Sequence, residues 1–341
     1  MDTGAVRLNS KSVNQLRRSL LAWYDQNKRD LPWRRSTDPY RVWVSEIMLQ
    51  QTRVAAVLDH YARFMRRFPT VQSLASARET SVLAAWSGLG YYHRARRMGH
   101  AARLIVRELH GKFPRKAEDW AKLPGIGRYT AAAIASIAFG EAVAAVDGNV
   151  ERVLTRLFGC ADGRESSWQR AETVLERERP GDSNQAMMEL GATICTPRAP
   201  QCQQCPLNRW CQSRGVDVAR PQAARKHEQL CYALVQKGGK VLLTRRPRDA
   251  SLMAAMWELP PFPESRRNGN PRVMRLRHSI INTDYEVLVF SAGRDAAQAS
   301  QNNLRWFSRR QWERLPLTGL ARKVLRRVES EVSSSESKQS Q

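Results

Sequence analysis

The chain has 341 residues, of which 42% are hydrophobic and 8% aromatic, and this composition excludes a wholly disordered protein. Its 56 Lys and Arg residues exceed its 32 Asp and Glu residues, so the formal net charge is +24 and the sequence pI is about 10.7. Because the basic excess lies on both sides of residue 212, it predicts two folded parts that face a polyanion such as nucleic acid.

The first residues carry no sign of a membrane anchor. The segment from Met1 to Ser19 has no apolar stretch, and no run in the chain approaches the roughly 18 to 20 apolar residues that cross a bilayer. We therefore expect no membrane partner, and a monomeric, cytoplasmic protein associated with the bacterial nucleoid.

After an N-terminal tail at 1–11, the chain is predicted to be helical as far as residue 212. Between Tyr91 and His110, apolar residues recur at alternating spacings of three and four, which is typical of an amphipathic helix. Strand alternation is scarce in this half, and Gly and Pro separate the apolar runs. Comparable helical patterns cover residues 54–68, 129–139, 150–158 and 185–195.

A glycine-bearing turn precedes one of these helices, in the sequence LPGIGRYTAAAI at 123–134. Gly125 and Gly127 allow a tight turn whose backbone N–H groups are exposed at a helix N-terminus. Such donors bind a phosphate without reading the base. In this context the turn resembles the helix-hairpin-helix of DNA repair glycosylases.

Asp147 and Asn149 lie immediately before the helix predicted at 150–158. Taken alone, an acidic residue in this position is most simply a helix N-cap.

Four cysteines follow within 17 residues, and they are Cys195, Cys202, Cys205 and Cys211. Structural zinc sites usually show two close cysteine pairs, whereas this segment has one C-x-x-C. We therefore favour four-thiolate ligation of an iron-sulfur cluster, with zinc as the alternative. The spacing is similar to that of the [4Fe-4S] loop of the endonuclease III superfamily.

The sequence pattern changes after residue 212. Residues 213–228 are polar and predict a linker, and short β-rich segments follow at 230–235, 240–244, 285–290 and 304–307. The expected architecture is a mainly α domain at 12–212, with its cluster loop at 195–211, and a smaller α+β domain at 229–330. A Ser-rich, disordered tail is expected at 331–341.

Residues 12–211 resemble the catalytic domain of the MutY family of adenine DNA glycosylases, which has the helix-hairpin-helix-GPD fold and a [4Fe-4S] cluster. The motifs that carry the resemblance are LPWR at 31–34, VSEIMLQQT at 44–52, GLGYY at 88–92 and NQAMMELG at 184–191. The resemblance implies a monofunctional enzyme of base excision repair. Its expected partner is double-stranded DNA with adenine opposite 8-oxoguanine or guanine.

Adenine is a poor leaving group, so its excision needs a proton on N7 and an anionic group beside the cationic sugar. By resemblance, Glu46 is the general acid and Asp147 stabilises the oxocarbenium ion. Tyr129 and Asn149 are expected to position Asp147 and the sugar.

Excision within a duplex also requires that the nucleotide be flipped out and that the gap be filled. By resemblance, Trp33, Arg34 and Gln185 surround the flipped adenine. Gln51 and Tyr91 correspond to wedge residues, and Thr52 and Leu89 lie beside the opposite base.

Three alternatives remain open. An endonuclease III-like lyase would need a lysine where this chain has Tyr129, and no lysine lies between Lys122 and Lys226. Thymine mismatch glycosylases carry the tyrosine but are not expected to have Glu46 or the C-terminal domain. A catalytically silent, cluster-bearing DNA-binding protein would not need Glu46 and Asp147.

Residues 229–330 resemble the Nudix-like C-terminal domain of the same family, through KVLLTRRP at 240–247 and MWELPP at 256–261. The acidic residues are scattered rather than clustered for Mg²⁺, so nucleotide hydrolysis is not expected.

In the family this domain recognises 8-oxoguanine through a loop of the form H-x-F-S-H. Here His278 and Ser279 begin the loop, and Ile281 and Asn282 replace its serine and second histidine. We therefore expect a weakened preference for 8-oxoguanine over guanine.

Overall fold

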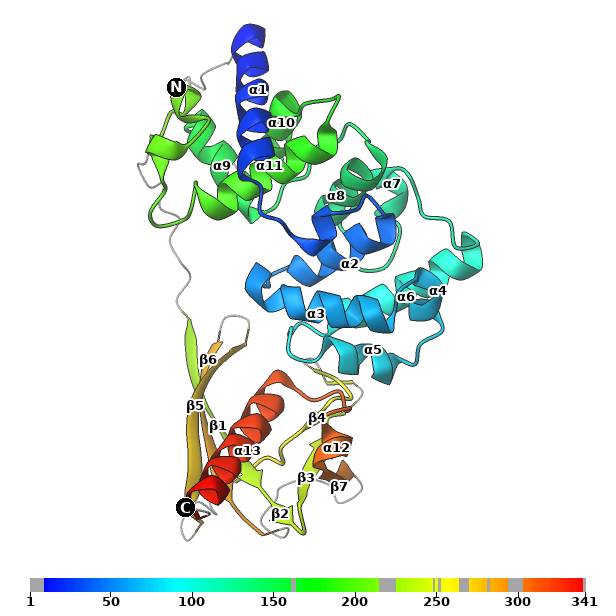
Figure 1. The fold of residues 1–341 in the computed structure, drawn as a ribbon, viewed down its shortest axis with the longest axis vertical. Coiled ribbons are helices and arrows are strands. Elements are labelled where there is room, and N and C mark those ends of the chain that lie inside the picture. The colour runs from blue at the N-terminus through cyan, green and yellow to red at the C-terminus, as the bar shows by residue number, and fades with distance from the viewer. Residues whose placement is uncertain are drawn as a thin grey trace. The chain divides into compact units, whose positions relative to one another are not determined.

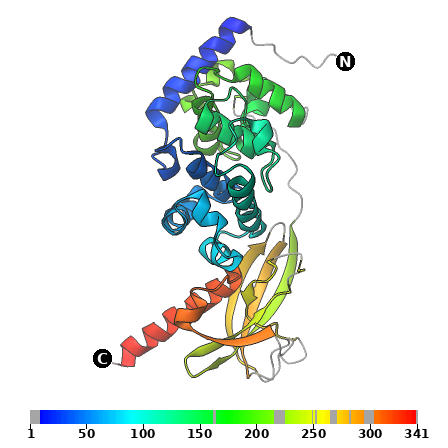
Figure 2. The ribbon, with the colours of Figure 1, turned by 90° about the vertical axis from the view of Figure 1, so that its right-hand side faces the viewer.

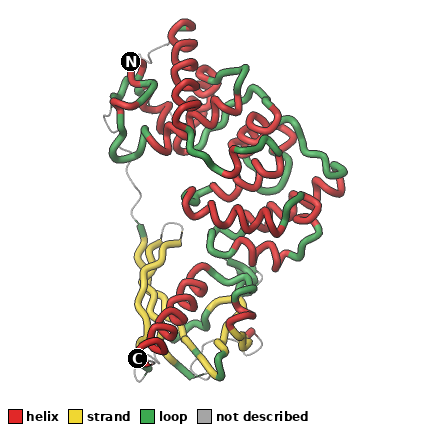
Figure 3. The backbone as a smooth tube through the Cα atoms, in the orientation of Figure 1, coloured by secondary structure: helices red, strands yellow, loops and turns green. Residues whose placement is uncertain are grey.

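A computed structural model describes residues 9–160, 164–214, 225–247, 249–250, 253–263, 270–280, 283–293 and 303–339. The chain forms two compact units, the first made of residues 1–76 and 100–221 and the second of 77–99 and 222–341. Figure 3 shows that helices build the described part of the first unit and that the strands belong to the second.

The first unit is a stack of helices (Figure 1). Its helical elements are α1 (Ser10–Asn27), η1 (Pro32–Arg34), α2 (Pro39–Leu49), α3 (Val54–Arg67), α4 (Val71–Ala75), α7 (Ala117–Trp120), α8 (Arg128–Phe139), α9 (Gly148–Phe158), α10 (Arg164–Val174), α11 (Pro180–Thr193), η2 (Cys202–Gln204) and η3 (Asn208–Trp210). Helix α6 (His93–Glu108) begins in the second unit and ends in the first.

Local sequence accounts for where these helices begin and end. Asp38 caps α2 by accepting a hydrogen bond from the Arg41 N–H, and Pro39 occupies the first turn, where no N–H is needed. Helices α8 and α9 both end at a glycine in the left-handed conformation, Gly140 and Gly159. The buried alanines of α8 allow α2, α7 and α11 to pack against it.

The second unit combines α5 (Glu79–Trp86) and the start of α6 with two small sheets. Strands β1 (Lys226–Leu234), β6 (Thr283–Ser291) and β5 (Arg272–Ile280) form one sheet in the order β1-β6-β5. The other contains β2 (Gln236–Lys237), β3 (Lys240–Arg245), β4 (Trp257–Glu258) and β7 (Leu304–Ser308). Helices α12 (Arg309–Trp312) and α13 (Gly319–Gln339) follow, and α13 runs beside the strands (Figure 2).

The core of the second unit explains why α13 is amphipathic. Its buried residues Leu320, Ala321, Val324 and Leu325 pack against side chains of both sheets. These positions recur at the helical period, so they form one apolar stripe, and the opposite face is polar.

The fold class expected from the sequence is confirmed: the described chain is mainly helical, with a smaller strand-containing part at its C-terminal end. The sequence patterns did not identify strand β5 or helix α13. No helix among the described residues has the length and apolarity needed to cross a membrane.

The domain boundaries differ in detail from the predicted ones. Residues 77–99, expected in the first domain, group with the second unit, and β1 begins at Lys226, inside the expected linker. Helix α1 begins at Ser10, inside the expected N-terminal tail. Helix α13 is assigned as far as Gln339, and the disordered tail expected at 331–341 stays a prediction. The subdivision at 12–212 and 229–330 stays a prediction.

Candidate active site

Three helices of the first unit place the two candidate catalytic carboxyls. Glu46 lies in α2 and is 6% exposed. Tyr129 lies in the first turn of α8, and its hydroxyl donates a hydrogen bond of 2.8 Å to Glu46 Oε2. Asp147 is the N-cap of α9. Segments that are far apart in the chain therefore meet at one site.

Glu46 is held in a setting that favours its neutral form. Burial, reinforced by the nearby charge of Asp147, raises the pKa of Glu46 to about 7, although the Tyr129 hydrogen bond and Arg34 act in the opposite direction. The Glu46 carboxyl can therefore carry a proton near neutral pH, as a general acid must.

Asp147 is held in a different setting. Its Oδ1 accepts hydrogen bonds from the backbone N–H groups of Asn149 at 2.9 Å and Val150 at 2.7 Å, and its Oδ2 accepts one of 3.2 Å from the Asn149 side chain. Burial is the largest effect and raises the pKa of Asp147 above its ordinary value, while these donors and Arg152 act in the opposite direction. The donors at the helix N-terminus therefore offset part of the cost of burying a carboxylate at this position.

Asn149 connects Asp147 to the cysteine loop through Arg152. The Arg152 guanidinium donates hydrogen bonds to Asn149 Oδ1 at 2.9 Å, to the carbonyl oxygen of Gly191 at 2.7 Å and to that of Cys195 at 2.9 Å. The sequence analysis missed Arg152; its position one turn after Asn149 in the helix was the signal that could have identified it.

Gly191 allows α11 to approach this group closely. A Cβ at Gly191 would lie 2.8 Å from Asn149 Cβ and 3.1 Å from the Asn149 carbonyl carbon and oxygen. Any larger residue at Gly191 would therefore displace Asn149 or α11.

The Arg34 guanidinium is held by the buried carboxylate of Glu189, a residue that the sequence analysis also missed. Glu189 has no exposed side-chain surface, and its oxygens pair with Arg29 at 2.6 Å and Arg34 at 2.7 Å. Burial alone would raise the pKa of Glu189, but the two guanidinium groups outweigh it and lower the pKa to about 2. Glu189 lies in the motif at 184–191, so the motif contained it without revealing its role.

The four cysteines line one cavity together with Arg156, Ile194, Pro200 and Asn208. Among the residues that the structure describes, no three ligand-type side chains converge as the ligands of a single metal ion do. Four thiols around one cavity are the donor set that an iron-sulfur cluster takes.

Helix α9 holds the cysteine loop in place. Arg156 is buried, and its guanidinium donates hydrogen bonds to the carbonyl oxygens of Thr196 at 2.7 Å and Pro197 at 3.1 Å, and to Cys195 Sγ at 3.4 Å. Burial raises the pKa of the Cys205 thiol to about 11 in the absence of bound iron. Cys195, Cys202, Cys205 and Cys211 would hold a cluster, which would link the parts of the loop to one another, while Arg156 connects the loop to α9.

The glycine turn has the geometry expected of a phosphate site. Gly125 has a positive φ of 81°, and Gly127 is the N-cap of α8. No side chain caps that end of α8, so its first N–H groups point outward.

The two candidate wedge residues share a backbone feature. Gln51 in the first unit has φ 55° and Tyr91 in the second has φ 47°. A left-handed conformation is uncommon for residues other than glycine and often marks functional sites. Gln51 is exposed, while the Tyr91 ring lies 5.3 Å from the Arg94 guanidinium.

The remaining predicted contacts are distributed over both units. Trp33 is buried, with its ring 5.3 Å from that of Tyr61, and Gln185 lies half-buried in α11. Thr52 is half-buried, and Leu89, expected beside the opposite base, is only 6% exposed.

The candidate 8-oxoguanine loop lies between β5 and β6. These strands pair antiparallel up to Ile280 and Thr283, and the hydroxyl of the exposed Ser279 donates to Asp284 Oδ1 at 2.5 Å. Ile281 and Asn282 lie outside the described residues.

A helical stack with a glycine hairpin, a buried and a half-buried carboxyl group and a four-cysteine loop resembles a class of DNA repair domain. Residues 44–177 match the model of the HhH-GPD superfamily of base excision DNA repair proteins, and residues 195–211 match that of the iron-sulfur binding domain of endonuclease III. The predicted cofactor, a [4Fe-4S] cluster, agrees with this assignment.

Within that superfamily the chain is similar to adenine DNA glycosylases. It is 52% identical to the Homo sapiens adenine DNA glycosylase over 217 residues, which are 59% of this chain and 40% of that protein. With the Arabidopsis thaliana adenine DNA glycosylase it shares 39% identity over 304 residues, 74% of this chain and 48% of that protein. The chain thus spans about half the length of the curated relatives it matches.

Two solved structures have the same helical fold. A thermostable thymine-DNA glycosylase matches 59% of this chain and 97% of its own, with a TM-score of 0.55 and 29% identity. Endonuclease III in a non-covalent DNA complex matches 61% of this chain and 97% of its own, with a TM-score of 0.54 and 23% identity.

Proposed function

We propose that the chain is a monofunctional adenine DNA glycosylase that removes adenine mispaired with 8-oxoguanine or guanine in double-stranded DNA. One observation carries the proposal. Burial raises the pKa of Glu46 to about 7, whereas Asp147 accepts three hydrogen bonds at a helix N-terminus. Two carboxyl groups in such different settings suit an acid and an anionic stabiliser.

In the proposed reaction Glu46 donates its proton to N7 of adenine. The bond between C1' and N9 then breaks, and its electron pair leaves with the base. The Asp147 carboxylate stabilises the resulting sugar cation, to which water adds at C1' with loss of a proton. The products are free adenine and an abasic site, and the strand remains intact.

Tyr129 supports the monofunctional assignment. A strand-cleaving lyase needs an amine to form a Schiff base with the sugar. At this position the chain has a phenol, which donates its hydrogen bond to Glu46. We therefore expect base removal without an efficient strand cut.

The relatives favour adenine over thymine as the excised base. The human adenine DNA glycosylase is 52% identical over 59% of this chain, whereas the thymine-DNA glycosylase is 29% identical over the same share. Adenine excision also provides a role for Glu46, since a leaving purine is activated by protonation at N7.

The proposed substrate contacts follow from these assignments. Arg34, held by Glu189, stands beside Glu46, and with Trp33 and Gln185 it would enclose the flipped adenine. Gln51 and Tyr91 would fill the gap in the duplex, with Thr52 and Leu89 at the opposite base.

Single-turnover excision on labelled duplexes tests the proposal, with adenine placed opposite 8-oxoguanine, guanine, cytosine or thymine. Each reaction is developed with and without alkali. Adenine loss that becomes visible only after alkali is the expected result, and the ratio of the 8-oxoguanine and guanine rates measures the effect of Ile281 and Asn282. Loss of thymine instead, strong covalent trapping by sodium borohydride, or no base loss from cluster-loaded protein would each contradict the assignment.

A further inference from the structure

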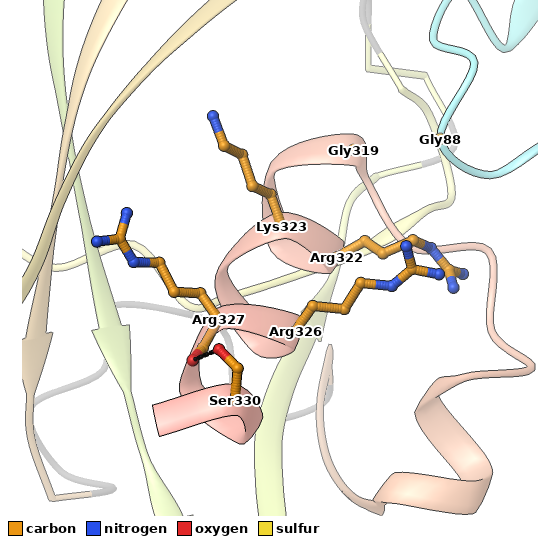
Figure 4. Close-up of a pocket in the computed structure, with 7 residues that line it drawn as sticks. All are labelled: Gly88, Gly319, Arg322, Lys323, Arg326, Arg327 and Ser330. Carbon is orange, nitrogen blue, oxygen red and sulfur yellow. Dashed lines mark hydrogen bonds between the residues drawn. The ribbon is translucent and has the colours of Figure 1, made fainter. Parts of the chain in front are cut away.

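A basic groove lies in the second unit and is lined by none of the candidate catalytic residues. It has a volume of about 440 Å³. It is lined by Gly88, Gly319, Arg322, Lys323, Arg326, Arg327 and Ser330 (Figure 4). Four of the seven lining residues are cations, and none of these lining residues is acidic.

The cations share one face of α13 because of the helical period. Along α13, pairs of cations alternate with pairs of apolar residues that pack in the core. The cations are Arg322, Lys323, Arg326 and Arg327. Packing of that stripe leaves the basic face outward. Figure 4 shows Arg322 and Arg326 extending toward the loop that carries Gly88, and Arg327 extending to the other side of the helix.

The same end of α13 braces the loop that contains the candidate wedge residue Tyr91. Leu317 offers its carbonyl oxygen to the hydroxyls of Ser87 at 2.9 Å and Tyr92 at 3.1 Å. Arg322 Nε donates to the Ser87 hydroxyl at 2.9 Å, and the Tyr92 hydroxyl accepts the Gly88 N–H at 3.3 Å. The loop and the basic face therefore form one rigid element of the second unit.

We propose that the basic face of α13 binds backbone phosphates of the duplex that flanks the mismatch. This inference rests on the proposed function in one respect, which is that the loop with Tyr91 enters the duplex at the mismatch. A duplex entered by Tyr91 would pass next to α13, where the four cations that line the groove match its phosphates. Contacts of this kind hold the DNA in register and carry no base preference.

Lys323 and Arg326 are the residues to change, because both are exposed and, unlike Arg322, neither is bonded to Ser87; Lys323 Nζ donates to the carbonyl oxygen of Arg277 in β5 at 3.1 Å. Each phosphate that the protein no longer neutralises should reduce the slope of log K against log salt concentration by about 0.9. The Lys323→Gln/Arg326→Gln variant should therefore bind a 20-base-pair duplex with a slope about 1.8 lower than the unchanged protein, whether or not the duplex has a mismatch. Arg326→Lys should retain the slope.

The matched control is Lys237→Gln/Lys240→Gln, which removes the same charge from the exposed turn between β2 and β3, outside the groove lining. The proposal is supported if only the α13 variant has a reduced slope while both variants keep the thermal midpoint. It is overturned if both slopes fall equally or neither falls. Saturable dGTP binding that the α13 variant lacks, with an unchanged duplex slope, would assign the groove to a free nucleotide. Since binding is measured without excision, failure of the glycosylase proposal is detected separately.

Discussion

The Tyr129 hydroxyl donates a 2.8 Å hydrogen bond to Glu46 Oε2 across 83 residues of sequence. Burial raises the pKa of Glu46, whereas this hydrogen bond lowers it. The acid is therefore adjusted by two opposing effects, of which burial is the larger.

Tyr129→Phe should shift the pH dependence of excision. A general acid works in its protonated form, so the rate of the unchanged protein should fall as pH rises through about 7. Without the phenol the carboxylate loses a stabilising donor, the pKa of Glu46 rises further, and the alkaline limb should move up by about one unit. Single-turnover rates between pH 5 and 9 measure this limb. A limb that stays in place or moves down would show that the phenol does not adjust Glu46.

Glu46→Gln should lower the excision rate by about 10²-fold or more, because the amide cannot supply the proton. The Glu46→Gln variant should nevertheless be more stable than the unchanged protein above neutral pH. The folded pKa of Glu46 lies near 7, above the ordinary value of 4.5, so ionisation opposes folding and stability is lost as pH rises through that window. Thermal midpoints should therefore favour the variant at pH 8 and agree with the unchanged protein at pH 4.5. Glu313→Gln, at an exposed glutamate, is the control and should show no such difference.

Arg152→Lys should slow excision by roughly 10-fold while the charge remains, since lysine cannot reproduce the three hydrogen bonds to Asn149, Gly191 and Cys195. Excision rates are normalised to cluster content, measured from visible absorption. A normalised rate equal to that of the unchanged protein would mean that Arg152 acts on the loop alone and not on Asn149.

Gly191→Ala should place a methyl group against Asn149 and lower the free energy of unfolding by about 1 to 3 kcal/mol. The excision rate should fall as well, because the displaced Asn149 donates to Asp147. Chemical denaturation and single-turnover kinetics measure the two effects. Gly293→Ala, where a Cβ would have no neighbour within 4 Å, is the control, and equal losses in both variants would contradict the steric explanation.

Many of the candidate site residues could be proposed from the sequence because they lie in short segments with a recognisable pattern. The hairpin at 123–134, the carboxyl residue before α9 and the four closely spaced cysteines each depend on neighbours in sequence. Local patterns also predicted helices α3, α6, α8, α9 and α11 to within about five residues, since helical periodicity and glycine caps are local properties.

Other features could not be predicted from local patterns. Helix α13 was not identified, and its four cations were not recognised as one face, because the apolar stripe that orients them needs both sheets to pack against. Gly191 is the last residue of the motif at 184–191, but the motif did not show why a glycine is needed there, since the reason is the close approach of Asn149 on another helix.

The sequence by itself determined which chemical groups are available: two carboxyls, a phenol, a glycine turn at a helix N-terminus and four thiols. Only the tertiary structure decided their settings, because burial and hydrogen-bond donors come from distant segments. The packing around α2 raises the pKa of Glu46 to about 7, and Asp147 is connected to the cysteine loop through Asn149 and Arg152.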